Sequence, residues 1–87
     1  MNYDICTIGS GSSHGGTVIT GDTNVLVNGK MVSRKGDLHD CPLPGHGITP
    51  ITGGCVETLV IDGQPVARVT STCGCGAVIT TGEPVKV

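Results

Sequence analysis

Asp37–His46, with the sequence DLHDCPLPGH, places His39, Cys41 and His46 within eight residues of one another. Two prolines and a glycine inside the segment favour a turn that holds these side chains close together. Imidazole and thiolate are the ligands that Zn²⁺ prefers, and a structural zinc site takes four of them. The other histidine of the chain is His14, far upstream. We therefore interpret the segment as the centre of a metal site that draws distant parts of the chain together.

The composition shows why such a site would be needed. The chain has 87 residues, 15 glycines, one tyrosine and neither tryptophan nor phenylalanine. We expect a single small domain spanning residues 1–87, and so few large side chains make it difficult to offset backbone entropy by burial alone. Five cysteines suggest either disulfides or a metal. Their odd number and the neighbouring histidines favour the metal.

Charge and hydropathy restrict the function classes. The net charge is −2 and the five basic residues are scattered, which argues against a nucleic-acid partner. The N-terminal sequence MNYDICTIGSGSS lacks the charged and apolar regions of a signal peptide. No apolar run reaches the length of a membrane span. We expect a cytoplasmic protein that, if exported, leaves by a route that needs no signal peptide.

Internal repetition is the strongest pattern in the chain. Three segments begin with a histidine or cysteine followed by glycine, and end with a second glycine seven residues after the first position: His14–Gly21 (HGGTVITG), His46–Gly53 (HGITPITG) and Cys75–Gly82 (CGAVITTG). Repetition at a fixed spacing indicates repeated structural units that pack against one another. The first residues of the three segments should therefore occupy equivalent places.

A second repeated element follows the first two copies. Val25–Val32 reads VLVNGKMV and Leu59–Val66 reads LVIDGQPV. Asn-Gly and Asp-Gly between apolar residues are the strongest short signals for a two-residue hairpin turn. The third copy ends at GEPVKV, where the chain stops before a further hairpin can form.

These features predict an all-β fold with little or no helix. The chain is rich in Val, Ile and Thr, which favour strands, and no window shows a helical stripe of apolar residues. A little under three repeats, each of roughly 30 residues, would form a three-fold pseudo-symmetric cone of short strands and hairpins. The ligand turns of the repeats would then meet at one end, near the apex.

The predicted metal ligands are one residue from each copy and one more: His14, His39, His46 and Cys75. Three of them begin the repeated segments, and each of these three lies directly before a glycine, where the backbone can bend sharply. The fourth, His39, is the natural addition because it lies in the same turn as His46. This set uses every histidine of the chain.

Two alternatives remain open within this set. Val32–Cys41 (VSRKGDLHDC) aligns with Val66–Cys75 (VARVTSTCGC), which places His39 opposite Cys73 and Cys41 opposite Cys75. Cys73 could therefore replace Cys75, and Cys41 could replace His39.

A structural role for the metal is favoured over a catalytic one. A catalytic zinc site keeps an open position and usually has a general base nearby, whereas four protein ligands leave no vacancy. The two glutamates, Glu57 and Glu83, lie outside the ligand turns. We therefore expect one structural Zn²⁺ per chain and no enzyme activity.

Four segments together resemble the PAAR-repeat proteins: SHGG (13–16), VNGKMVSRKGD (27–37), HDCPLPGHG (39–47) and IDGQPVARV (61–69). The family is named for a Pro-Ala-Ala-Arg motif, whose nearest match here is PVAR at 65–68. The resemblance extends from about Gly9 to Gly82. The sequence departs from the family pattern at two places: MVSR (31–34) replaces the motif in the first repeat, and after Arg68-Val69 in the second repeat Thr70-Ser71 replaces the expected Gly-Asp.

The resemblance implies a small cone with zinc near its apex, bound by three histidines and one cysteine. Such proteins cap the trimeric β-helical spike, of the valine-glycine-repeat type, in type VI secretion systems. They sharpen the spike for puncturing a target-cell membrane and can carry effector proteins. The expected partners are therefore the spike trimer, possible effectors and, transiently, a membrane, with export on the spike to the cell exterior or a target cell.

Two other functions fit the same residues. A stand-alone zinc module could bind another protein or sense redox state through its surplus cysteines. A phage or contractile-tail spike could use an equivalent tip, and the sequence does not separate that system from a secretion system.

Overall fold

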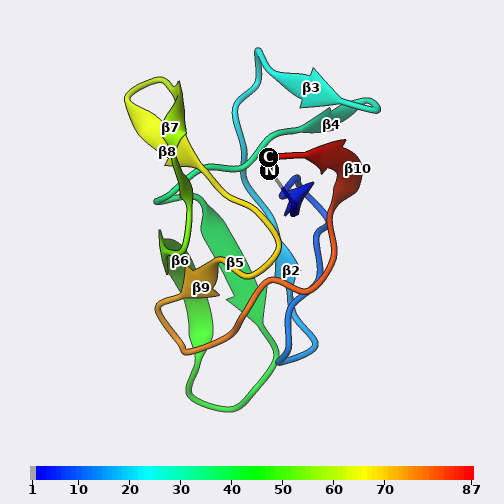
Figure 1. The fold of residues 1–87 in the computed structure, drawn as a ribbon. Helices are drawn as coiled ribbons and strands as arrows, with labels where there is room; N and C mark the ends of the chain where they lie inside the picture. The colour runs from blue at the N-terminus through cyan, green and yellow to red at the C-terminus, as the bar shows by residue number, and fades with distance from the viewer. Residues whose placement is uncertain (1) are drawn as a thin grey trace.

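The computed structural model describes residues 2–87, which form ten short strands and no helix (Figure 1). The strands are β1 (Asp4–Ile5), β2 (Thr17–Val18), β3 (Leu26–Val27), β4 (Lys30–Met31), β5 (Leu38–Cys41), β6 (Gly47–Gly53), β7 (Val56–Ile61), β8 (Gln64–Val66), β9 (Thr72–Cys73) and β10 (Glu83–Lys86). The predicted all-β class is confirmed. Within this range no helix has the length and hydrophobicity needed to cross a bilayer.

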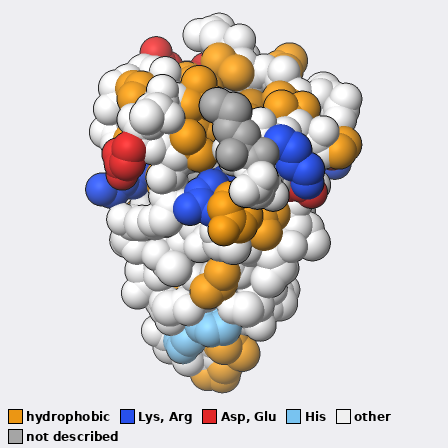
Figure 2. All heavy atoms as spheres, in the orientation of Figure 1, with side chains coloured by type: hydrophobic (Ala, Val, Ile, Leu, Met, Phe, Trp, Pro, Cys, Tyr) orange, Lys and Arg blue, Asp and Glu red, His pale blue; other side chains and the backbone are white. Residues whose placement is uncertain are grey.

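The molecule tapers from a wide end to a narrow end (Figures 1 and 2). Its principal extents are 32, 24 and 22 Å. A curled antiparallel sheet, in the order β2-β5-β6-β9, forms the narrower half. Three two-stranded ribbons, β3-β4, β7-β8 and β1-β10, form the wide end. This arrangement corresponds to the cone predicted from the repeats.

Both predicted hairpins form with the expected turns. Asn28 and Gly29 connect β3 to β4 with φ angles of 52° and 78°, and Asp62 and Gly63 connect β7 to β8 with φ angles of 50° and 80°. Positive φ at both central residues defines the type I′ turn, whose twist matches that of the two strands. The dipeptides therefore determine the local geometry as predicted.

The third ribbon is built from the two ends of the chain. The third copy lacks a hairpin of its own, as its sequence suggests, but β10 pairs with β1 in its place, with Asp4 opposite Lys86. The pairing continues beyond the strands, where the Val87 N–H donates to the Tyr3 carbonyl at 2.8 Å. The wide end therefore carries three ribbons, although the sequence supplies only two hairpins.

A closed ring of backbone hydrogen bonds lies at the centre of the pseudo-three-fold arrangement. The N–H of Cys6 donates to the carbonyl of Ala67, Ala67 donates to Ser33, and Ser33 donates to Cys6, at 3.0, 2.9 and 3.0 Å. All three residues are fully buried. Small side chains are needed here because the three segments approach each other closely. The ring also shows that the segment beginning around Cys6 is the N-terminal counterpart of the two aligned segments that follow the hairpins, Val32–Cys41 and Val66–Cys75.

A tight turn follows each member of this ring. Each of the three turns contains one residue with positive φ: Gly9 (89°) in the first, Gly36 (94°) in the second and Thr70 (83°) in the third. The next side chain accepts the N–H of the residue three positions upstream, in the pairs Ser10–Thr7 (3.0 Å), Asp37–Arg34 (2.7 Å) and Ser71–Arg68 (3.0 Å). The Thr70-Ser71 departure from the family pattern therefore preserves the turn. It places a β-branched residue where glycine is favoured.

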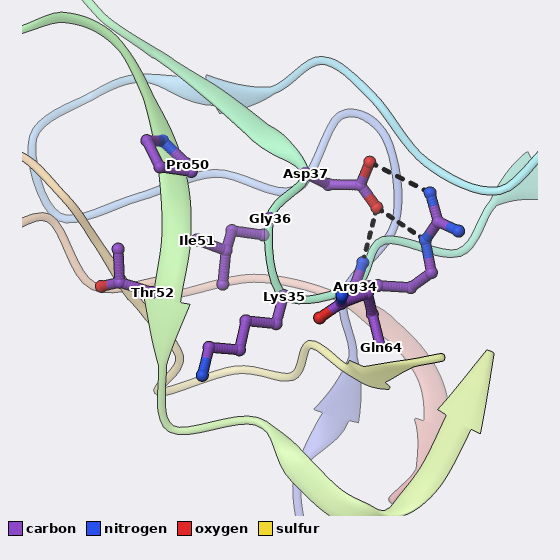
Figure 3. A pocket seen from close by; sticks show the side chains of 8 residues that line it. All are labelled: Arg34, Lys35, Gly36, Asp37, Pro50, Ile51, Thr52 and Gln64. Atoms are coloured by element: carbon purple, nitrogen blue, oxygen red, sulfur yellow. Dashed lines mark hydrogen bonds and ion pairs between the residues drawn. The ribbon is translucent and has the colours of Figure 1, made fainter. Parts of the chain in front are cut away.

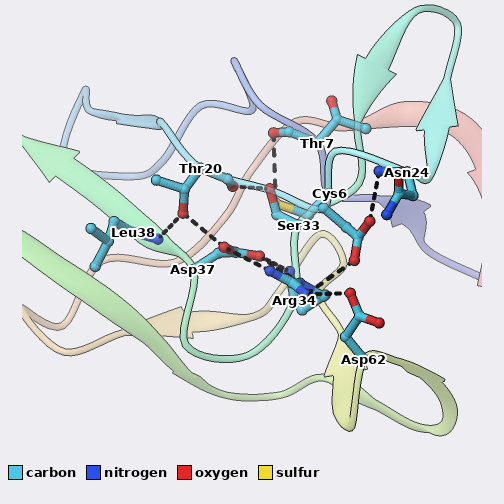
Figure 4. A network of polar contacts seen from close by, with 10 residues as sticks. Cys6, Thr7, Thr20, Asn24, Ser33, Arg34, Asp37, Leu38 and Asp62 are labelled. Carbon is cyan, nitrogen blue, oxygen red and sulfur yellow. Dashed lines mark hydrogen bonds and ion pairs between the residues drawn. The ribbon is translucent and has the colours of Figure 1, made fainter.

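The first of the two aligned arginines has a structural role in the body of the cone. Arg34 contacts the carboxylates of Asp22 (3.2 Å), Asp37 (3.1 Å) and Asp62 (3.5 Å), and we call these four residues the Arg34 cluster (Figure 4). The Thr20 hydroxyl also donates to Asp37 at 2.8 Å. Because its members come from different repeats, the cluster connects these repeats to one another beneath the ribbons.

Apolar packing is limited to two small clusters. Ile5, Val32 and Val66 pack beneath the ribbons. A second cluster, nearer the narrow end, contains Cys6, Val18, Ile51, Ala67, Cys73, Ala77 and Ile79. Neither contains an aromatic side chain, so burial is modest, as the composition indicates.

Candidate metal centre

Four donor side chains converge at the narrow end of the cone. The donor atoms of His14, Cys41, His46 and Cys75 all lie within 4.8 Å of one another, and we call these residues the donor group. The space-filling view shows histidine side chains at this end (Figure 2). Recorded contacts are Cys41 Sγ to His14 Nδ1 (3.5 Å), Cys41 Sγ to His46 Nδ1 (3.4 Å) and Cys75 Sγ to His14 Nδ1 (3.8 Å).

These separations fit a tetrahedral zinc site. With Zn–S near 2.3 Å and Zn–N near 2.0–2.1 Å, adjacent sulfur and nitrogen ligands of a tetrahedron are about 3.6 Å apart. The observed sulfur–nitrogen distances of 3.4 to 3.8 Å lie around this value. Two imidazoles and two thiols are also donors that zinc prefers. The donor group could therefore hold the ion that the family resemblance implies.

The predicted role of the glycine after the first residue of each repeated segment is confirmed by the backbone. Gly15, Gly47 and Gly76, which follow the first residues of the three repeated segments, have φ angles of 80°, 62° and 91°. These positive values allow the chain to reverse directly after the donor. A residue with a Cβ would strain each turn.

Three of the donors occupy equivalent positions when counted from the central ring. His14, Cys41 and Cys75 each come eight residues after their ring member. The second repeat has a longer turn before its buried isoleucine, Ile51. That longer turn supplies the fourth donor, His46, so by this count Cys41, and not His46 as the repeated segments predict, is equivalent to His14 and Cys75. One repeat therefore contributes two donors, and each of the others contributes one.

His39 lies beside the donor group and not within it. Its side chain is fully buried, its Nε2 is 2.7 Å from Ser12 Oγ, and its Nδ1 is 3.9 Å from Cys75 Sγ. The structure thus gathers three of the four predicted ligands and places Cys41, the alternative to His39, with them. Cys73, the alternative to Cys75, belongs to the apolar core. Ligation itself stays a prediction.

The two sulfur donors differ in their protonation. Burial acts to raise the pKa of Cys75, but the polar groups around its sulfur, which are the Thr49 hydroxyl, the Ala77 backbone and the rings of His46 and His14, favour the thiolate and lower the pKa to about 5. Burial raises the pKa of Cys41. Because zinc binds thiolates, Cys75 is prepared for a metal at neutral pH.

A surface groove lies apart from the donor group. Its volume is about 500 Å³, and it is lined by Arg34, Lys35, Gly36, Asp37, Pro50, Ile51, Thr52 and Gln64 (Figure 3). Two of these residues, Arg34 and Asp37, are bound to each other in the Arg34 cluster. None of the lining residues belongs to the donor group. The groove is therefore separate from the candidate metal centre.

Comparison with known families agrees with the fold and the site. The model of the PAAR motif family matches residues 8–81, which include every residue of the donor group. The comparison with curated proteins gives no match. The family is one of structural tip proteins of type VI secretion spikes and not a family of enzymes. On the extent of this match, the chain belongs to the PAAR motif family.

Proposed function

We propose that this chain caps and sharpens the trimeric β-helical, valine-glycine-repeat spike of a type VI secretion system, and that one structural zinc ion holds its apex together. The observation that carries the proposal is the polarity of the cone: three ribbons at the wide end and a compact His/Cys donor group at the narrow end. A three-fold wide end matches the symmetry of a trimeric partner.

The wide end has the chemistry of a docking surface for strands. Each ribbon exposes large apolar side chains: Leu26 on β3, Leu59 and Val60 on β7, and Val85 on β10. Each ribbon has two strands, so its outer edges present backbone groups that can extend a partner's sheet. We expect an interface that is mainly apolar and formed through the backbone, with one monomer meeting all three chains of the spike.

The narrow end requires reinforcement for puncturing a membrane. Its aromatic-free core is small, whereas a structural zinc contributes an apparent ~10–16 kcal/mol of coupled binding and folding in small peptides. That range is comparable to the whole stability of an ordinary domain. A metal bound by donors from all three repeats would join them at the point that meets the membrane.

The proposed route follows from this role. The chain is synthesised in the cytoplasm, assembles on the spike, and leaves the cell with it, together with any effector that it carries. Redox sensing by the surplus cysteines fits less well, because burial raises the pKa of Cys6 to about 12 and that of Cys73 to about 11. Thiols of this kind react slowly, since the thiolate is the nucleophile.

The test is binding of the purified, zinc-loaded chain to a spike trimer, with two matched variants. Leu26 on β3 and Ile48 on β6 are both 57% exposed, the first on a ribbon and the second on the sheet of the narrower half. Leu26→Asp should weaken binding at least tenfold, because a charge would be buried in an apolar interface, whereas Ile48→Asp should bind as the wild type does. Equal binding by both variants, or no binding by the wild type, would refute the proposal.

A further inference from the structure

We propose that the apex metal of this chain is bound by His14, Cys41, His46 and Cys75, and that His39 orients the Cys75 thiolate without binding the metal. The inference rests on the metal site proposed above. It departs from the set of three histidines and one cysteine that the family resemblance implies. His39 is therefore assigned as a positioning residue.

Both ring nitrogens of His39 already have partners. Nε2 is 2.7 Å from Ser12 Oγ, and Nδ1 is 3.9 Å from Cys75 Sγ. Ser12 Oγ accepts the Gly16 N–H at 3.2 Å, so its own proton is available for Nε2 of His39. With Nε2 as the acceptor, the neutral ring carries its proton on Nδ1 and directs it at the Cys75 thiolate. We assign the order of donation as Ser12 to His39 to Cys75.

The ring has little freedom to leave this position. His39 is fully buried, and a Cβ placed on Gly16 would come within 2.7 Å of its Nε2. The backbone at Gly16, directly before β2, therefore packs against the imidazole. Moving Nδ1 into the donor group would break the bond to Ser12, because the ring is rigid and both nitrogens move together.

Repeat position also separates His39 from the donors. Six residues after the central ring, the three repeats place Ser12, His39 and Cys73, all of them buried. Eight residues after the ring, they place His14, Cys41 and Cys75. Within β5, two residues correspond to about 6.6 Å, and the alternating burial of this strand places His39 and Cys41 in two successive layers on the same inward face. His39 therefore belongs with Ser12 and Cys73, its equivalents in the other two repeats, and neither of these residues joins the donor group.

The difference in donor set has an electrostatic consequence for a membrane-puncturing tip. Two thiolates and two neutral imidazoles balance the 2+ charge of zinc, whereas one thiolate and three imidazoles leave a net positive charge. A net charge carried into an apolar medium is costly, because water no longer solvates it. The assigned set makes the apex site neutral.

X-ray absorption at the zinc edge of the wild-type, zinc-loaded protein tests the donor set without a mutation. We expect two sulfur ligands near 2.3 Å and two nitrogen ligands near 2.0–2.1 Å. One sulfur and three nitrogens would overturn this inference while leaving the proposed zinc tip intact. A purified protein that binds no zinc at all would instead overturn the zinc site, and this inference with it.

Two variants and a control test the role of His39. His39→Gln should retain one zinc per chain and two sulfur ligands, with affinity lowered about 10–100-fold, as for other groups that orient a ligand. Cys41→Ser should lose one sulfur ligand, whereas Cys55→Ser, which removes a half-buried cysteine outside the donor group, should leave the spectrum unchanged. If His39→Gln lost a nitrogen ligand and Cys41→Ser left the number of sulfur ligands unchanged, the assignment would be reversed.

Nitrogen NMR of the zinc-loaded wild type provides a readout that does not depend on the folding of a variant. We expect His39 to carry a proton on Nδ1 and a free, hydrogen-bonded Nε2, and His14 and His46 to show the shifts of metal-bound nitrogen. Zinc bound at Nδ1 of His39 would refute the positioning role.

Discussion

Replacing Arg34 with methionine isolates the contribution of the Arg34 cluster to the stability of the cone. The Arg34 side chain is 20% exposed, and it lies between two carboxylates that are almost completely buried, Asp22 at 3% and Asp37 at 9%. Methionine retains much of the apolar stem but removes every guanidinium contact. Both carboxylates would then remain buried without their cation.

The expected loss is large for so small a domain. Breaking a buried ion pair by removing one partner costs about 3–5 kcal/mol, because the other charge is left without compensation. Asp37 keeps hydrogen bonds from Thr20 and from the backbone N–H of residue 34, so the lower part of this range is expected. For a domain of this length each kcal/mol lowers the melting temperature by roughly 4–8 °C, which predicts a decrease of more than about 10 °C.

Arg68 supplies the matched control, because it holds the same position in the next repeat. Its guanidinium lies 4.0 Å from the centre of the Tyr3 ring and donates to Thr70 Oγ1 at 2.7 Å, an exposed contact. An exposed cation–π contact is worth about 0.5–1 kcal/mol, so Arg68→Met should have a small effect. Urea and thermal unfolding of the two zinc-loaded variants would measure the difference. Equal losses would refute the assigned role of the Arg34 cluster.

Three further perturbations follow from local geometry. Thr70→Gly should stabilise the protein by about 1 kcal/mol in urea unfolding, because it relieves a β-branched residue at φ 83°; a loss of stability would contradict this. Gly16→Ala should yield little folded protein by circular dichroism, because its Cβ would collide with the Asp40 carbonyl and approach His39; native-like yield would contradict the packing. In metal-free protein, Cys75 should titrate near pH 5 in ultraviolet thiolate absorbance, and Cys75→Ser should lack this step. Since the folded pKa lies below the ordinary 9.0, the stability from this thiolate is complete above pH 9 and is lost progressively as pH falls to 5; a flat profile would contradict it.

Local patterns were sufficient to predict the hairpins and the ligand turns. Asn28-Gly29 and Asp62-Gly63 form type I′ turns because few other dipeptides accept positive φ at both positions. Gly15, Gly47 and Gly76, which follow the first residues of the three repeated segments, adopt positive φ for the same reason. These features depend only on neighbouring residues, so one sequence contains enough information for them.

Features that depend on distant contacts could not be predicted in the same way. The β1-β10 ribbon joins the two ends of the chain, and no local signal marks that pairing. His39 and Cys41 lie on the same face of β5 at similar spacing from His14, so the sequence left their roles open. The contact that distinguishes them is the bond from His39 to Ser12, 27 residues away.

Metal content measured together with stability tests the central claim most directly. The purified protein should contain one zinc ion per chain by elemental analysis, and chelation should lower its free energy of unfolding by several kcal/mol. Adding zinc back should restore both values. A protein without zinc, or one whose stability does not change when zinc is removed, would contradict the claim that a metal holds the apex of the cone together.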